Sequence, residues 1–177
     1  MPKGTLTTVE GDVTNPQRTA PNEIVLIPHC CNNLKIMGAG VAKSLKNKWP
    51  EVYEVYQKTA MCLGEVSFVA VGDGEDIKTI VANMIGQDGI VSLGNSKPVK
   101  YWALAKAMVE ITDYIYNHFQ EDKVVIHTPK FGSELAQGNF EFILELIREI
   151  WLEQGIDVKV YEFVPPNTDN TDIFATF

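Results

Sequence analysis

One segment of the chain gathers the residue types that could carry out chemistry on a ligand. Residues 29–42 (HCCNNLKIMGAGVA) combine a histidine, two cysteines and two asparagines with a Gly-Ala-Gly turn. A histidine such as His29 titrates near neutral pH and can act as an acid, as a base or as a nucleophile toward phosphorus. Glycines let the backbone approach a ligand, and a helix that starts behind them points free N–H groups into the same space. The segment therefore predicts a turn that binds an anion.

A second segment, residues 129–138 (PKFGSELAQG), is also rich in glycine and small polar residues. Each of the two segments follows a short apolar run that predicts a buried strand, at residues 23–29 and 123–128. In sheets of this kind, ligands bind beyond the carboxyl ends of the strands. We therefore expect the two segments to meet at one edge of a sheet.

A dinucleotide-binding turn is the first alternative for the Gly-Ala-Gly sequence. That turn, G-x-G-x-x-G, follows its strand at once, whereas eight residues separate His29 from Gly38 and Lys43 replaces the third glycine. No acidic residue ends a second strand about 20 residues further on, where a ribose contact would be needed. These departures disfavour the dinucleotide fold and leave a plain turn as the remaining alternative.

The cysteines and histidines predict neither a metal site nor a cofactor. Cys30 and Cys31 are adjacent, and no C-x-x-C spacing exists among the three cysteines. His118 and His127 share no ligand spacing with them. A thiol nucleophile activated by the nearby Lys35 is a weak alternative, because no C-x5-R phosphate loop follows.

Alternating strands and helices must position these segments. Strands are predicted at residues 5–9, 23–29, 66–71, 77–85, 123–128 and 158–164. Helices are predicted at residues 38–48, 51–59, 98–119 and 139–154. The turn at residues 72–74 joins its two strands as a hairpin. The pattern predicts a three-layer α/β sandwich around a mixed sheet, as one domain over residues 1–166 with a polar tail at residues 167–177.

Composition narrows the classes of partner. The net charge is −8, which disfavours nucleic acid, because such partners are gripped through many phosphates by basic faces. A single small anion is still compatible, because backbone N–H groups can bind phosphate without side-chain charge. The longest apolar runs, such as residues 24–27, are strand-sized and do not predict a membrane span, so we expect a cytoplasmic protein. Nothing in the sequence predicts the oligomeric state.

Seven segments, in order along nearly the whole chain, together resemble the macrodomain family, which binds ADP-ribose. They are VEGDVTN (9–15), HCCNNLKIMGAGVAKSLKNKWPEVYEVY (29–56), LGEV (63–66), VANMIGQ (81–87), PVKYWAL (98–104), PKFGSELAQGNF (129–140) and VKVYEF (158–163). The likeness is greatest to the branch that holds ADP-ribose 1″-phosphate phosphatases and glycohydrolases that remove terminal ADP-ribose from proteins. It implies a six-stranded mixed sheet between helices, in agreement with the predicted elements.

The resemblance implies ligand contacts at matching positions. The Asp12 carboxylate would accept a hydrogen bond from the adenine amino group, the Val13 N–H would meet the ring, and Phe163 would stack on it. Asn32 would fix the hydroxyls of the distal ribose with its amide donor and acceptor. The two glycine segments would hold the pyrophosphate by main-chain donors through Met37, Gly38, Ala39, Gly40, Val41, Gly132, Ser133, Glu134, Leu135 and Ala136.

Each side chain also has a purely structural alternative. Asp12 could cap its own turn, Phe163 could belong to the core, and Asn32 with Asn33 could shape the turn that holds them. His29 matches a histidine of the phosphatase-like branch, but a core histidine satisfied by backbone is an equal alternative.

The chain departs from the family's glycohydrolase pattern, which uses a lysine after the fourth strand and an aspartate in the second glycine loop. Residues 85–87 (IGQ) and Ala136 stand at these positions, so covalent lysine chemistry is not expected. Asp88 and Glu134 are the nearest carboxylates that could activate water.

The prediction from sequence is an ADP-ribose-binding protein that hydrolyses a derivative, first of all ADP-ribose 1″-phosphate. His29 and Asn32 are the candidate catalytic residues. Two alternatives stay open: a reader that binds free or protein-linked ADP-ribose without hydrolysis, and an ADP-ribosyl-ester hydrolase.

Overall fold

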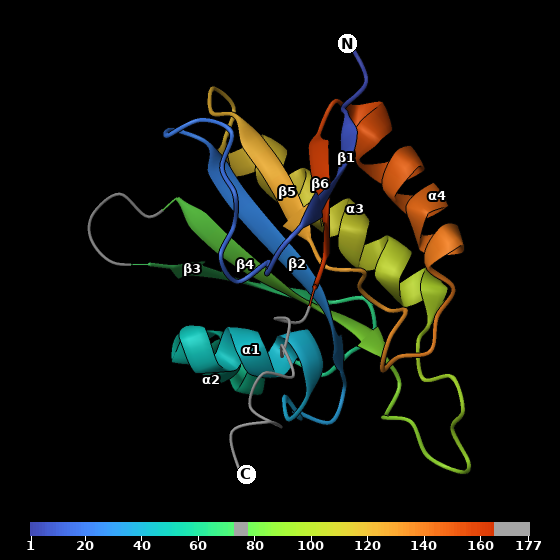
Figure 1. Cartoon of the computed structure of the whole chain (residues 1–177). Coiled ribbons are helices and arrows are strands. Elements are labelled where there is room, and N and C mark those ends of the chain that lie inside the picture. The colour runs from blue at the N-terminus through green and yellow to red at the C-terminus, as the bar shows by residue number, and fades with distance from the viewer. Residues whose placement is uncertain (73–77, 165–177) are drawn as a thin grey trace, which may run out of the picture.

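A computed structural model describes residues 1–72 and 78–164 of the chain (Figure 1). In this part of the chain one mixed sheet has the order β1-β6-β5-β2-β4-β3. Its strands are β1 (Leu6–Glu10), β2 (Ile24–Asn32), β3 (Val66–Val71), β4 (Thr79–Gln87), β5 (Val124–Thr128) and β6 (Asp157–Glu162). The helices are α1 (Gly40–Lys48), α2 (Pro50–Lys58), α3 (Tyr101–His118) and α4 (Phe140–Ile150), with a 3-10 turn η1 (Leu152–Gln154).

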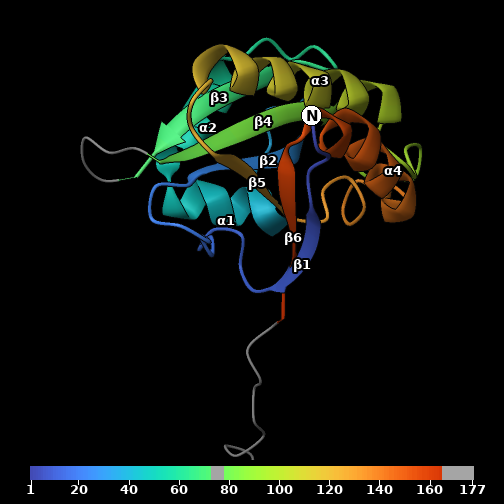
Figure 2. The same ribbon diagram turned by 90° about the horizontal axis from the view of Figure 1, so that it is seen from above.

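The sheet lies between two helical layers, with α1 and α3 on opposite faces (Figure 2). Side chains alternate along β2, so Val25 and Ile27 enter the core under α1 and α2, whereas Ile24 and Leu26 enter the core under α3 and α4. Each fully buried aliphatic side chain of this kind contributes about 1.5–3 kcal/mol. The predicted three-layer α/β sandwich is confirmed.

Strand directions also follow the prediction. β3 and β4 are antiparallel, and the other neighbouring pairs are parallel. The hairpin is confirmed in its two strands, although residues 73 and 74 of its turn lie outside the described residues, as does the tail at residues 167–177. No helix within residues 1–72 and 78–164 is long and apolar enough to cross a membrane.

Pro28 splits the sheet where the candidate site lies. The Ile24 N–H donates to Lys123 O on the β5 side and the Val25 N–H donates to Lys78 O on the β4 side, so alternation turns the nitrogen of Pro28 toward β5. Proline has no N–H to donate. Pairing of β2 with β5 ends at Leu26 and Ile126, while β2 continues along β4 as far as Asn32. Beyond Leu26 the two halves of the sheet are therefore not hydrogen-bonded to each other.

The predicted end of the second strand is wrong by three residues. β2 runs to Asn32, not His29, with an irregular register between Cys31 and Asn32. The first helix starts at Gly40, two residues later than predicted, because Ala39 is extended. Pro50 separates α1 from α2 as the sequence predicted, since proline suits the first turn of a helix and not its interior.

Candidate functional site

Two adjoining cavities lie beyond the split in the sheet. The smaller has a volume of about 380 Å³ and is bounded by the end of β2, the start of α1 and the loop at residues 129–137. The larger, of about 530 Å³, is bounded by residues 11–13, α1 and the end of β6. The residues that line both are Gly40, Val41, Pro129, Lys130 and Glu134. The two cavities therefore form one elongated cleft.

The first wall of the cleft is the N-terminus of α1. Residues 38–42 line the smaller cavity, and the helix has neither a side-chain cap nor an acidic residue in its first turn. Its first N–H groups and the positive end of its dipole are thus left for an anion. Gly40 has φ of +59°, a left-handed conformation that a residue with a β-carbon adopts at a cost.

The second wall is the loop at residues 132–138, which is closed on itself. The Gly138 N–H donates to Gly132 O at 2.7 Å, and the Gln137 N–H donates to Glu134 O at 3.1 Å. Gly132 has φ of +73°, and a β-carbon there would lie 3.0 Å from side chains of Leu104 and Ile143. The loop shape is therefore set by its own backbone bonds and by the core below it.

The two walls touch. A β-carbon on Gly40 would lie 3.3 Å from Leu135 Cδ1, so the helix start and the second loop meet at the waist between the cavities. The prediction that the two glycine segments meet at one sheet edge is confirmed.

Asp12, Val13 and Phe163 stand together at the larger cavity. Asp12 Oδ1 accepts hydrogen bonds from the Thr14 N–H at 2.9 Å and the Thr14 hydroxyl at 2.7 Å, so the capping alternative for Asp12 is realised at one of its oxygens. Phe163 is 67% exposed, and the core alternative for this ring is wrong. Two segments far apart in sequence, residues 12–13 and Phe163, thus line one end of the cleft.

His29 lies under the smaller cavity with both ring nitrogens against protein groups. Its side chain is buried, Nε2 is 2.5 Å from Asn83 Oδ1, and Cys31 Sγ lies 3.7 Å from Nδ1. Burial lowers the pKa of His29 to about 4, against a smaller opposing effect of the Asn83 hydrogen bond. The ring is therefore neutral at pH 7, which disfavours a role as general acid. A role as base or nucleophile is compatible with a neutral ring, but Nε2 is already engaged by Asn83.

Asn32 shapes the loop that follows it. Its Oδ1 accepts from the Leu34 N–H at 2.9 Å and from the Tyr56 hydroxyl at 3.0 Å, and its Nδ2 donates to Ile36 O at 2.9 Å. Asn33 is tied to the neighbouring loop through Asp88 and Gly89. The structural alternative for both asparagines is realised, and one N–H of Asn32 is left for a ribose hydroxyl.

Two other residues named as ligand contacts do not line the cavities. The Met37 side chain is 3% exposed and packs in the core under α1 and α2, so only its main chain could make the predicted contact. Ser133 does not line either cavity, and its hydroxyl donates to Lys130 O at 2.7 Å. Cys30 and Cys31 line the smaller cavity, but burial raises the pKa of Cys30 to about 12 and raises that of Cys31 as well. Thiolate chemistry is thereby disfavoured.

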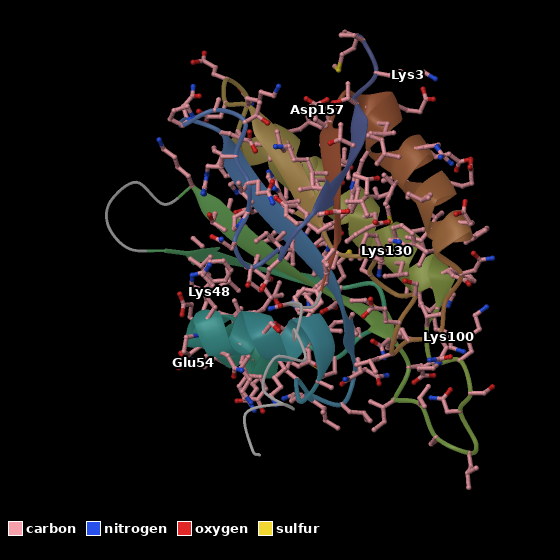
Figure 3. All side chains as sticks on the ribbon, in the orientation of Figure 1. Lys3, Lys48, Glu54, Lys100, Lys130 and Asp157 are labelled. Atoms are coloured by element: carbon pink, nitrogen blue, oxygen red, sulfur yellow. The ribbon has the colours of Figure 1, made fainter. Side chains whose placement is uncertain are left out.

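Sequence reasoning missed Lys130 and three aliphatic side chains. Lys130 lines both cavities, and its Nζ lies 3.0 Å from Glu162 Oε1 (Figure 3). Its place next to Pro129, within the second glycine segment, was the available signal. Ile36, Ile90 and Val91 line the smaller cavity although each is exposed, and no sequence pattern marked them.

Comparisons with known proteins identify the family. No protein-family model and no curated protein matches the sequence. Among solved structures, a protein of unknown function from Bacteroides thetaiotaomicron is 31% identical, with a TM-score of 0.77 over 91% of this chain and 99% of that one. The Thermosipho africanus DarTG structure in complex with ADP-ribose is 16% identical, with a TM-score of 0.62 over 88% of this chain and 45% of that one, a likeness of fold alone.

A macrodomain protein from Streptomyces coelicolor is 30% identical to this chain, with a TM-score of 0.69 over 89% of this chain and 98% of that one. Together with the mixed six-stranded sheet and the cleft beyond it, this similarity shows that the chain belongs to the macrodomain family.

Proposed function

We propose that the cleft binds ADP-ribose or a derivative of it. The observation that carries the proposal is the waist at Gly40 and Leu135, where an uncapped helix start lies between two cavities. A pyrophosphate flanked by two ribosyl groups has this shape: a charged centre with a bulky group on either side. The fold likeness to a protein in complex with ADP-ribose agrees with this proposal.

The pyrophosphate would be held mainly by backbone. The first turn of α1 offers N–H groups and a favourable dipole, and no acidic side chain in that turn opposes an anion. Lys130 lines both cavities and adds one cation near the waist. Its pairing with Glu162 is exposed and therefore weak, so the ammonium can exchange partners.

The adenine would occupy the larger cavity. A carboxylate has about four acceptor sites, so the two bonds that Asp12 Oδ1 accepts leave the group able to accept from an adenine amino group. Phe163 presents an exposed ring at the same cavity, where a base can stack on it. The distal ribose would then occupy the smaller cavity, next to Asn32.

Titration calorimetry with ADP-ribose, ADP, AMP and NAD tests the proposal. We expect ADP-ribose to bind most tightly, ADP to bind more weakly because it lacks the distal ribose, and Asp113→Ala on the exposed side of α3 to bind like the wild type. Absence of heat with millimolar ADP-ribose, from protein whose thermal unfolding is cooperative, would exclude it.

Hydrolysis of a derivative is the second candidate, and the position of Glu134 favours it. Its exposed carboxylate lines both cavities at the waist. On ADP-ribose 1″-phosphate, Glu134 would take a proton from water as the water attacks phosphorus. The bond from phosphorus to the ribose oxygen breaks, and Glu134 passes that proton to the leaving oxygen, which gives inorganic phosphate and ADP-ribose with a 1″-hydroxyl. On an ADP-ribosyl ester, the same water would attack the carbonyl carbon of the uncharged ester group.

Phosphate release from ADP-ribose 1″-phosphate separates the enzyme from the reader. We expect release by the wild type, a loss of about a hundredfold or more in Glu134→Gln because general-base catalysis is removed, and little change in Glu141→Gln on exposed α4. The chain is a reader if the wild type binds ADP-ribose but releases neither phosphate from ADP-ribose 1″-phosphate nor carboxylic acid from an ADP-ribosyl ester above the rate in buffer.

A further inference from the structure

Five large aliphatic side chains stand exposed on two neighbouring loops beside the smaller cavity. The loops are residues 33–36 and 88–95. We call this surface the apolar rim; its members are Leu34, Ile36, Ile90, Val91 and Leu93. Each is at least 44% exposed, and Ile36, Ile90 and Val91 also line the smaller cavity. The apolar rim is therefore continuous with one mouth of the cleft, at the end away from Asp12.

The loops that carry the rim are braced by hydrogen bonds. Ser92 and Asn95 exchange backbone bonds of 3.0 and 3.1 Å, and Asn95 Nδ2 donates to Asp88 O at 2.8 Å. Asn33 joins the two loops, because its Nδ2 donates to Asp88 Oδ1 at 3.0 Å and its Oδ1 accepts from the Gly89 N–H at 2.8 Å. The backbones of the two loops are thus braced, which lowers the entropy that these loops would lose on binding a partner.

The surroundings of the rim are basic in an acidic protein. The chain has a net charge of −8, yet residues 33–36 and 88–100 carry Lys35, Lys97 and Lys100 against the single carboxylate of Asp88. Asp88 is already bonded to Asn33. Lys100 stands at the start of α3, where the 88–99 loop joins the helix (Figure 3). A partner of this surface would pair apolar side chains with acidic ones.

We propose that the apolar rim binds the polypeptide to which an ADP-ribosyl group is attached, so that the natural ligand of the cleft is ADP-ribosylated protein with apolar and acidic residues around the attachment point. This inference rests on the proposed function. The distal ribose would lie in the smaller cavity, and the rim begins where a group linked to that ribose must leave it.

Free ADP-ribose ends in hydroxyl groups and gains nothing from aliphatic side chains beyond that point. A polypeptide does gain, because exposed apolar patches at the edge of a site are typical of protein contacts. A single nucleic acid strand is disfavoured, since its bases are bound by aromatic platforms and the rim has only aliphatic side chains.

Binding of four probes tests the inference. They are free ADP-ribose, an 11-residue mono-ADP-ribosylated peptide with leucine and valine beside the modified residue and aspartates further out, a matched peptide with serines and lysines at those positions, and a mono-ADP-ribosylated single-stranded oligonucleotide. We expect the apolar-acidic peptide to bind the wild type at least about tenfold more tightly than free ADP-ribose, as measured by calorimetry. The serine-lysine peptide is expected to bind like free ADP-ribose.

The variant Leu34→Ser/Leu93→Ser removes two rim side chains that do not line either cavity. We expect it to bind free ADP-ribose like the wild type and to lose the advantage of the apolar-acidic peptide. Val109→Ser, at a similarly exposed position on α3, is the control and is expected to keep that advantage.

Equal affinity of the wild type for both peptides and free ADP-ribose would overturn the role of the rim and leave the proposed function standing; this comparison needs no variant. Tighter binding of the oligonucleotide than of the apolar-acidic peptide would overturn a polypeptide partner. Failure to bind any probe, free ADP-ribose included, would instead remove the proposed function on which the inference rests.

Discussion

Leu135 Cδ1 lies 3.3 Å from the point where a β-carbon on Gly40 would stand. Gly40 opens α1 on one side of the cleft and Leu135 belongs to the loop on the other, so the two walls approach each other here. The pair also explains why glycine occupies position 40, where both the backbone angle and the neighbouring side chain oppose a larger residue.

Substitution Gly40→Val should damage both stability and binding. A left-handed φ costs a residue with a β-carbon about 1–2 kcal/mol, and a branched side chain would also push against Leu135. We expect a free energy of unfolding lower by about that amount and ADP-ribose affinity lower by about tenfold or more, measured by urea unfolding and calorimetry. Gly94→Ala is the control, since its β-carbon meets open space; wild-type affinity in Gly40→Val would show that the waist is not where the ligand binds.

Asp12 combines two roles that substitutions can separate. Asp12→Asn keeps an acceptor for the Thr14 hydrogen bonds but replaces the other oxygen by an amide NH₂, which opposes the amino group of adenine. We expect it to unfold like the wild type and to bind ADP-ribose about tenfold more weakly. Asp12→Ala should lose binding and also about 0.5–2 kcal/mol of stability, as for lost caps elsewhere. Unchanged affinity in both variants would show that Asp12 only stabilises its own turn and does not contact the ligand.

The buried His29 should make the protein less stable as the pH falls below 6.5. Its pKa is lowered to about 4 in the folded state, from 6.5, so between these values the unfolded chain binds more protons and stability rises with pH. From pH 6.5 to 5 we expect a loss of about 1.5–2 kcal/mol from this residue. The contribution is fully present above pH 6.5.

Urea unfolding at pH 7.5, 6.5, 5.5 and 5.0 measures this effect. His29→Gln should have a shallower pH dependence than the wild type, with part of the slope remaining because burial also lowers the pKa of His127. Parallel curves for the wild type and His29→Gln would mean that the imidazole is not held neutral by burial.

Alkylation should separate the cysteines. Burial raises the pKa of Cys30 to about 12 and that of Cys31 above its usual range, whereas Cys62 is exposed. Because the thiolate is the reactive species, iodoacetamide at pH 7.5 should modify only Cys62 in the folded protein and all three thiols after unfolding in urea, as followed by mass spectrometry. Rapid labelling of Cys30 in the folded protein would reopen the thiol hypothesis.

The order of the elements was readable from the sequence because their apolar patterns are local. The end of β2 was not, because Cys30, Cys31 and Asn32 are extended through pairing with β4, and nothing within the segment itself announces that partner. The same register puts Asn83 opposite His29, so the hydrogen-bond partner of the histidine lies 54 positions away in the chain, and the burial that keeps the ring neutral depends on packing that the segment alone does not reveal.

In the site, the glycine segments were predictable because glycine readily adopts the positive φ that these turns require. Lys130 was overlooked because a main-chain cradle was expected to suffice, and its position at the waist depends on how the second loop folds back. The apolar rim was hidden for a related reason. Ile90, Val91 and Leu93 look like ordinary loop residues in the sequence, and only the structure shows that their loop is hydrogen-bonded to the loop that carries Leu34 and Ile36.

The cleft lies where the strands β2 and β5 stop pairing, close to Pro28. Pro28 lacks the N–H that would face β5, and the pairing of β2 with β5 ends two residues earlier, at Leu26. The cleft therefore depends on two parts of the fold: the ladder, in which β2 and β5 separate, and the start of α1 with the loop at residues 132–138, which form its walls.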